Sequence, residues 1–143
     1  MTNYLVDVNV WAAIAVAEHV HHAAALLWLG ARETGQIGFC RVTQQGFLRL
    51  LSNARIMGGD ALPAIRAWAV YDGMFGDSRV RFFPEPAGLE SHWRQATRHR
   101  RTGPNFWTDA YLSAFAAAAG LTLVTFDRAF AHHSLATVQV LEA

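Results

Sequence analysis

Three aspartates stand where carboxylates could bind a divalent cation. Asp7 follows the apolar run Tyr4–Val6, and Asp127 lies two residues beyond the apolar run Leu121–Thr125. Asp109 begins a helical segment that leads into the second of these runs. Carboxylates brought together repel one another unless a cation lies between them, and oxygen ligands of this kind suit Mg²⁺ or Mn²⁺. The sequence therefore indicates a metal site, provided that the fold brings the three side chains to one place.

Each of these aspartates also has a purely structural explanation. Asp7 could form an Asx turn or cap a helix after a strand, and the macrodipole would favour Asp109 in the first turn of a helix. Asp127 could cap a short segment that covers residues 128–132. The case for chemistry comes from the coincidence, because of the 11 acidic residues only these three fall where the topology predicts a site.

The segments that must position these acids alternate between strands and helices. Strands are predicted at residues 4–6, 36–40, 80–83, 121–125 and 137–141, the last of them at an edge of the sheet. Helices are predicted at residues 8–17, 22–32, 43–51, 60–70, 86–99 and 109–119. This alternation predicts a three-layer α/β/α fold, in which helices cover both faces of a central, mainly parallel five-stranded sheet.

Capping residues mark several of the predicted helix ends. Asp60 is predicted to cap the helix that continues through Val70, and Thr108 to cap the helix that begins at Asp109 and ends at Gly120. In a sheet of this kind the ligand site lies beyond the carboxyl ends of the strands. If the first and fourth strands are neighbours, all three aspartates can meet at that edge.

Composition limits the remaining possibilities. The chain has 143 residues and a formal net charge of +1, which fits one domain over residues 1–143. All 12 Lys and Arg side chains are arginine, which excludes Schiff-base chemistry and a P-loop lysine. The single cysteine, Cys40, excludes a disulfide framework and is predicted to be buried beside Phe39. Without a secretory signal or an apolar stretch long enough for a membrane span, a cytoplasmic protein with no membrane partner is expected.

Three segments together resemble the motifs of a known nuclease family. The segment Leu5–Val10, an apolar strand followed by Asp-x-Asn, resembles the opening signature of PIN domains. Residues 108–112 (Thr-Asp-Ala-Tyr-Leu) and the downstream segment 120–130 resemble the closing signature. The segment Arg41–Leu51 is similar to the middle motif of one branch of that family, the VapC toxins. The resemblance covers nearly the whole chain.

What the resemblance implies is a Mg²⁺-dependent endoribonuclease, with Mn²⁺ as a substitute metal. Such a toxin hydrolyses RNA phosphodiester bonds, with tRNA or rRNA as the expected substrate, inhibits translation and is neutralised by a VapB-type antitoxin. A homodimer is also implied. The five tryptophans and nine phenylalanines support an interface, because they exceed what one small core is expected to bury.

The matching motifs also imply a role for individual residues. Asp7, Asp109 and Asp127 would be the catalytic, metal-binding acids, with Asp127 either a third ligand or a residue that orients water. Thr125 would help to position these acids. Asn9 would hold the loop or a water molecule near the metal. The water would attack the phosphate in line, with the developing charge offset by metal and arginine.

The middle motif departs from the family pattern. Many PIN domains carry a glutamate there, whereas the candidate positions in this chain hold Gln44, Gln45 and Gly46. Gln45 can offer a carbonyl oxygen or orient a water, but a glutamine cannot act as a base. Three acids favour one well-held metal ion over two. The alternative function is a catalytically degenerate PIN domain that binds RNA or protein without cutting.

An arginine-rich stretch lies just upstream of Asp109. Arg98, Arg100 and Arg101, with Arg94 one turn earlier, could grip the RNA backbone, because phosphate contacts position a strand without reading its sequence. A solvated helix end, where cations complement the helix dipole, explains the same residues equally well.

Other aromatic and basic side chains have simpler explanations. Phe106 and Trp107 could stack on a base, although such residues more often pack against the core. A zinc site at His19, His21 and His22 is disfavoured because no intact zinc-binding motif is present, and His22 is better explained by helix packing.

Three other enzyme classes fit the sequence less well. An aspartate-nucleophile phosphatase also begins with a strand and an aspartate, but it normally needs a second aspartate where this chain has Asn9, and a later lysine. A Ser-His-Asp hydrolase would need a Gly-x-Ser-x-Gly turn, which is absent. A dinucleotide-binding enzyme would need Gly-x-Gly-x-x-Gly after the first strand.

Overall fold

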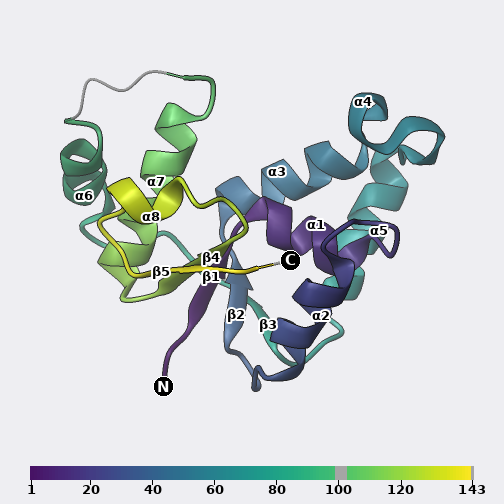
Figure 1. Ribbon diagram of the computed structural model, residues 1–143, viewed down its shortest axis with the longest axis horizontal. Coiled ribbons are helices and arrows are strands. Elements are labelled where there is room, and N and C mark those ends of the chain that lie inside the picture. The colour runs from purple at the N-terminus through teal and green to yellow at the C-terminus, as the bar shows by residue number, and fades with distance from the viewer. Residues whose placement is uncertain (99–102, 143) are drawn as a thin grey trace.

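A parallel sheet with the strand order β3-β2-β1-β4-β5 forms the centre of the computed structural model, which describes residues 1–98 and 103–142 (Figure 1). The strands are β1 (Tyr4–Val6), β2 (Ile37–Phe39), β3 (Val80–Phe82), β4 (Thr122–Thr125) and β5 (Val138–Val140). Within the described residues, all four neighbouring pairs are parallel. The predicted five-stranded sheet is therefore confirmed, with β1 directly beside β4.

Helices cover both faces of this sheet, which confirms the three-layer prediction (Figure 1). One face carries α6 (Leu89–Ala96), α7 (Phe106–Ala119) and α8 (Phe130–His133). The other face carries α1 (Val8–Ala15), α2 (His22–Gly30), α3 (Arg41–Leu51) and α5 (Ala64–Met74). Between α3 and α5, a short helix α4 (Ala54–Met57) and a 3-10 turn η1 (Gly58–Asp60) form an extension at one end of the molecule.

Alternation along the strands separates the buried side chains into two cores. Leu5 and Leu123 pack with α7, while the next residues, Val6 and Val124, pack on the opposite face. All four side chains are fully buried. Strands covered on both faces have apolar residues throughout, which explains why β1 and β4 lack the alternating polar pattern of a half-exposed strand. Burial of both faces fixes the register of the two strands that carry the predicted acids.

The predicted start of α5 is wrong. Helix α5 begins at Ala64 with Pro63 at its N-cap position, and Asp60 instead ends the preceding turn η1. Proline fixes its own φ, here −66°, and its missing N–H removes no helical hydrogen bond at the start of a helix. The chain therefore enters α5 through the proline rather than through an aspartate cap.

The predicted start of α7 is also too late. Asn105 occupies the N-cap position, and the Asp109 N–H donates to its carbonyl oxygen at 2.8 Å. Thr108 therefore lies inside the first turn instead of capping the helix. Gly120 ends α7 in the left-handed conformation, with φ of +68°, as predicted. No helix in the described ranges is long and apolar enough to cross a membrane.

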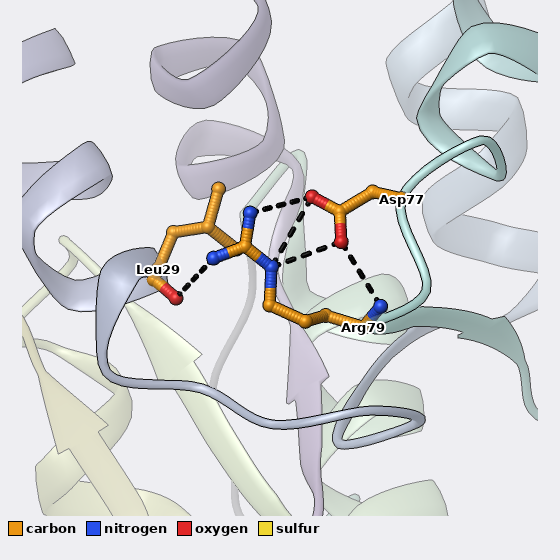
Figure 2. A network of polar contacts seen from close by, with 3 residues as sticks. All are labelled: Leu29, Asp77 and Arg79. Atoms are coloured by element: carbon orange, nitrogen blue, oxygen red, sulfur yellow. Dashed lines mark hydrogen bonds and ion pairs between the residues drawn. The ribbon is translucent and has the colours of Figure 1, made fainter.

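The edge of the sheet opposite the carboxyl ends of the strands is closed by a polar network (Figure 2). The Arg79 guanidinium donates to both carboxylate oxygens of Asp77 and, through Nη1, to the Leu29 carbonyl oxygen at 2.9 Å. The guanidinium holds the pKa of Asp77 below its ordinary value. These contacts join the end of α2 to the start of β3, so they serve the fold rather than the predicted site.

Gly46 allows α3 to pack very closely against the start of α1. A Cβ atom on Gly46 would lie 2.7 Å from Cγ2 of Val8, a distance too short for two carbon atoms. Val8 is β-branched and sits at the first position of α1, so its methyl group has little freedom to move. A side chain at position 46 would therefore push the two helices apart next to Asp7.

Gly46→Ala should destabilise the protein although alanine is the better helix former. The overpacking against Val8 costs roughly 1–3 kcal/mol, which exceeds the gain in helix propensity of roughly 0.5–1 kcal/mol. Gly73→Ala is the matched control, because a Cβ atom there meets nothing within 4 Å and should be neutral or stabilising. Denaturant unfolding measures both changes, and Val8→Ala should partly restore the stability of Gly46→Ala. Equal stability of the two alanine variants would contradict the close packing.

Candidate active site

Asp7 joins the end of β1 to the start of α1. Its N–H continues the sheet by donating to the Val124 carbonyl oxygen at 2.9 Å. Its Oδ1 atom accepts from the Val8 N–H at 2.8 Å, which caps helix α1. Its Oδ2 atom accepts from the Thr125 hydroxyl at 2.8 Å. The carboxylate is thus held by one bond within its own segment and one from the neighbouring strand.

Thr125 links the three segments that converge at this edge of the sheet. Its fully buried hydroxyl donates to Asp7 and accepts from the Asn9 side-chain amide at 3.3 Å and from the Asp127 N–H at 3.0 Å. The Asn9 carbonyl oxygen accepts in turn from the Phe126 N–H at 3.3 Å. Asn9 and Thr125 therefore connect α1 to the loop that follows β4.

Asp127 turns back onto its own loop. Its Oδ1 atom accepts from the Ala129 N–H at 2.9 Å, and its carbonyl oxygen accepts from the Phe130 N–H at 3.3 Å. The residue is exposed, so its carboxylate is open to water and to a substrate. Asp127 therefore forms a turn before α8 rather than the predicted cap, because the N-cap residue of that helix is Ala129 and no side chain caps it.

The loop between Thr125 and Asp127 is braced by a ring contact that the sequence did not reveal. The Phe126 ring stacks on His21, with centroids 4.5 Å apart and planes 22° from parallel. Next to it, the His22 ring donates from Nδ1 to the Ala13 carbonyl oxygen at 2.7 Å, which ties α2 to α1 as predicted. The stacking of His21 on Phe126 leaves no sequence signal, because the two residues lie far apart in the chain.

Asp109 approaches the same edge from α7. Burial, and then the negative charges of Asp7 and Asp127, raise its pKa from 3.8 to about 6. Burial also raises the pKa of Asp7, against the opposing effects of the Thr125 and Val8 hydrogen bonds. The three carboxylates that the sequence singled out are therefore close enough for their charges to interact.

The three aspartates are not arranged as the ligands of one ion, however. In the described part of the chain, no three His, Cys, Asp or Glu side chains form a ready-made metal site. Asp7 and Asp127 each use one carboxylate oxygen to cap a backbone N–H, which directs that oxygen into the protein. A cation would therefore bind mainly through the other carboxylate oxygen of each of these two residues.

Comparison with known proteins identifies the family of the chain. The sequence matches the PIN domain family over residues 4–134. Ribonuclease VapC41 of Mycobacterium tuberculosis is 42% identical over 134 residues, which cover 90% of this chain and 92% of that protein. The chain belongs to the PIN domain family, in its VapC ribonuclease branch.

Solved structures show the same PIN fold. The chain is similar to Mycobacterium tuberculosis VapC20, described as a Sarcin-Ricin loop cleaving toxin, with a TM-score of 0.70 and 22% identity over 98% of this chain and 100% of that one. It is also similar to VapBC2 of Rickettsia felis bound to a DNA fragment from its promoter. That comparison gives a TM-score of 0.68 and 14% identity over 99% of this chain and 100% of the other. At these identities the likeness shows the fold alone.

The middle motif of this PIN domain places its three candidate residues in different surroundings. Gln44 is buried and accepts from Nη1 of Arg41 at 2.6 Å, while Gly46 lies against Val8. Gln45 is exposed, and no hydrogen bond joins it to the three aspartates within the described residues. Its role near the acids stays a prediction.

The predicted RNA-binding arginines are only partly visible in the structure. Arg98 is exposed just beyond α6, whereas Arg100 and Arg101 lie outside the described residues. Arg94 forms an exposed ion pair with Glu90 one turn away on α6, at 3.0 Å. That pairing explains Arg94 without RNA, and the role of the other three stays a prediction.

Trp107 contacts other aromatic rings but remains largely exposed. Its ring contacts those of Trp93 and Phe106, with centroids 6.2 Å and 5.3 Å apart. Its carbonyl oxygen accepts from the Trp93 indole N–H at 3.2 Å, yet 62% of the Trp107 residue remains exposed. Both predicted uses of this residue, packing and base stacking, remain open to it.

Thr125→Val should destabilise this PIN domain by roughly 1–3 kcal/mol, because the buried Asp7 oxygen and Asp127 N–H each lose a hydrogen-bond partner. Thr125→Ser keeps the hydroxyl and should retain most of the stability. Chemical denaturation of both variants measures the difference. If valine proved as stable as serine, the hydroxyl would not hold the site together.

The raised pKa of Asp109 predicts a pH-dependent stability. The folded state favours the protonated form of Asp109. Its contribution to the free energy of unfolding is therefore fully present below pH 3.8 and is lost as the pH rises through about 6. Asp109→Asn lacks this ionisation. Its melting temperature relative to the parent should therefore increase between about pH 4 and about pH 7 in EDTA. If the melting temperatures of the variant and the parent changed equally with pH over that range, Asp109 would not have a raised pKa in the folded protein.

Proposed function

We propose that this PIN domain is a cytoplasmic, Mg²⁺-dependent endoribonuclease and the toxin of a type II toxin–antitoxin pair. The observation that carries the proposal is the electrostatic interaction of Asp7, Asp109 and Asp127 at the carboxyl edge of β1 and β4. With a divalent cation held by the carboxylates, such a site would suit RNA hydrolysis, in which negative charge develops on a phosphate. Inhibition of translation would follow from cleavage of tRNA or rRNA.

The donor set fits a hard divalent cation. Carboxylate oxygens are preferred by Mg²⁺ and Mn²⁺, and the mutual repulsion that raises the pKa of Asp109 would be relieved by positive charge. Asp7 and Asp109 would hold the ion, with Asp127 as a third ligand or as a residue that orients water. A bound Mg²⁺ supplies charge stabilisation at the phosphate and lowers the pKa of water.

The chain's own residues would prepare the site for the reaction. Thr125 keeps the Asp7 carboxylate in place through Oδ2, and Asn9 fixes the loop that carries Asp127. The exposed Asp127 carboxylate can accept a hydrogen bond from the attacking water and orient it toward the phosphate. Because no glutamate is present at Gln44, Gln45 or Gly46, one metal ion is expected to be held well rather than two.

A second candidate function is a degenerate PIN domain that binds RNA or protein without cutting. The observation in its favour is the middle motif, which has no acid at positions 44–46 and in which Val8 fills the space that a side chain at position 46 would need. The intact set of three interacting aspartates argues against it. Cleavage separates the two functions directly.

Partners are proposed from the relatives and from the surface. The similar structure from Rickettsia felis is a VapBC complex, which supports a VapB-type antitoxin as a partner of this chain. Large apolar side chains are exposed on α2, α4 and α5, among them Leu27, Ile56 and Ile65. Such a surface suits burial against an antitoxin or a second copy of the chain in a homodimer.

The proposal predicts cleavage that needs both Mg²⁺ and Asp7. Purified, antitoxin-free protein should cut total tRNA or rRNA into discrete fragments with Mg²⁺, and EDTA should abolish the products. Asp7→Asn should reduce cleavage by roughly 100-fold or more, because it removes a carboxylate that would hold the ion whose charge offsets the developing negative charge. Gel electrophoresis of the RNA measures each result.

Asp60→Asn is the matched control, because Asp60 is an exposed aspartate in η1 outside the site, and full activity is expected. Equal cleavage by Asp7→Asn and the parent would rule out the assignment of Asp7. If the parent binds RNA but yields no fragments with Mg²⁺ or Mn²⁺, the degenerate binding function is favoured instead.

A further inference from the structure

Arg41 lies at the same edge of the sheet as Asp7. The register pairs Leu5 with Gly38, so continuing it places Asp7 level with Cys40, the residue just before Arg41. The Arg41 guanidinium carbon lies 4.8 Å from the centre of the Phe82 ring, at the end of the next strand, β3. The charge of Arg41 is therefore about two strand spacings, or about 10 Å, from the strand that carries Asp7.

Two contacts hold the guanidinium in a defined orientation. Its Nη1 atom donates to Oε1 of the buried Gln44 at 2.6 Å, and its plane is supported by the face of Phe82. The Arg41 residue is nevertheless exposed. The remaining N–H groups of the guanidinium are available for a ligand without a large loss of side-chain entropy.

The positive charge of Arg41 forms no ion pair within the described residues. Arg79 and Arg94, by contrast, are each neutralised by a neighbouring acid, Asp77 and Glu90. A planar, preoriented guanidinium without a carboxylate partner matches the geometry and charge of a phosphate group. Arg41 thus has the features of an anion-binding residue beside the carboxylates.

Tyr71 connects this arginine to an exposed aromatic ring. Tyr71 on α5 is buried, and burial raises its pKa against the opposing effect of the nearby Arg41 cation. Tyr71 also contacts Trp68, with ring centroids 5.9 Å apart and planes nearly perpendicular. Trp68 is 47% exposed, which leaves indole surface for stacking on a base.

We propose that Arg41 and Trp68 form a nucleotide subsite for single-stranded RNA beside the three carboxylates. Arg41 binds a backbone phosphate next to the one that is cut, and Trp68 stacks on a base further along the strand. The RNA then crosses the carboxyl edge of the sheet from β4 and β1 toward β3. This inference rests on the proposed ribonuclease function and names the path of its substrate.

RNA binding without cleavage tests the subsite. Asp7→Asn protein is titrated into a fluorescein-labelled, short single-stranded RNA of mixed sequence, and anisotropy is recorded over a series of salt concentrations. In this background, Arg41→Gln should weaken binding and reduce the slope of log affinity against log salt by about 0.7, the value for one phosphate contact. Trp68→Ala should weaken binding about fivefold or more and leave the slope unchanged.

Matched variants separate the contacts from general effects. Arg55→Gln removes the same charge from an exposed position on α4 and should leave the slope unchanged. Arg41→Lys keeps the charge and should keep the slope, while melting temperatures establish that each variant is folded. An unaltered slope in folded Arg41→Gln, or unaltered affinity in folded Trp68→Ala, overturns the subsite.

The outcome is independent of the proposed catalytic activity. Absence of Mg²⁺-dependent cutting by the parent would refute the proposed ribonuclease but would not change the salt slopes, which are measured without cleavage. Conversely, if the parent cleaves RNA but Arg41→Gln and Trp68→Ala bind RNA as well as their background protein does, only the subsite is refuted. If Arg41→Gln and Trp68→Ala weakened binding of an antitoxin but left RNA binding intact, this surface would be assigned to protein recognition and the RNA path would be overturned.

Discussion

The hydroxyl of Thr125 supports the candidate site because it ties Asp7 and Asn9, at the end of β1 and the start of α1, to the loop that follows β4. It is fully buried and makes one hydrogen bond each with Asp7, Asn9 and the backbone of Asp127. Each bond contributes roughly 0.5–1.5 kcal/mol net, but a buried group left without its partner costs more. The parallel pairing of β1 with β4 brings the hydroxyl within reach, and the sheet thereby sets the positions of the acids.

Opposing this order is the repulsion among the carboxylates. Burial and neighbouring negative charges raise the pKa of Asp109, and burial raises that of Asp7. The fold therefore keeps ionisable groups where ionisation is unfavourable, a common property of sites that carry out chemistry. Two of the acids relieve part of the strain by capping backbone N–H groups. A cation or a bound partner would relieve the rest.

The sheet and the edge at which the acids lie could be predicted from the sequence, because both depend on patterns of neighbouring residues. Apolar runs followed by aspartate gave β1 and β4, and the rule that ligands bind beyond the carboxyl ends of parallel strands gave the edge. Helix starts were predicted less well, because Asp60 and Thr108 have the right side chains for caps but the chain enters each helix elsewhere.

Contacts between distant segments could not be predicted. The stacking of His21 on Phe126 and the different surroundings of Gln44 and Gln45 depend on how α1, α2 and α3 pack. The pairing of Arg94 with Glu90 was in principle readable, since the two residues are one helical turn apart. That Arg41 forms no ion pair within the described residues became visible only in three dimensions.

The contact between Gly46 and Val8 also constrains how this sequence can change over evolutionary time. A glutamate at position 46 would meet the Val8 methyl group, so gaining a fourth acid by one substitution would first disturb the helix that Asp7 caps. A smaller residue at position 8 must precede or accompany it. The two positions are therefore coupled, because the effect of a glutamate at position 46 depends on the size of the residue at position 8, whereas the exposed Gln45 is free of this constraint.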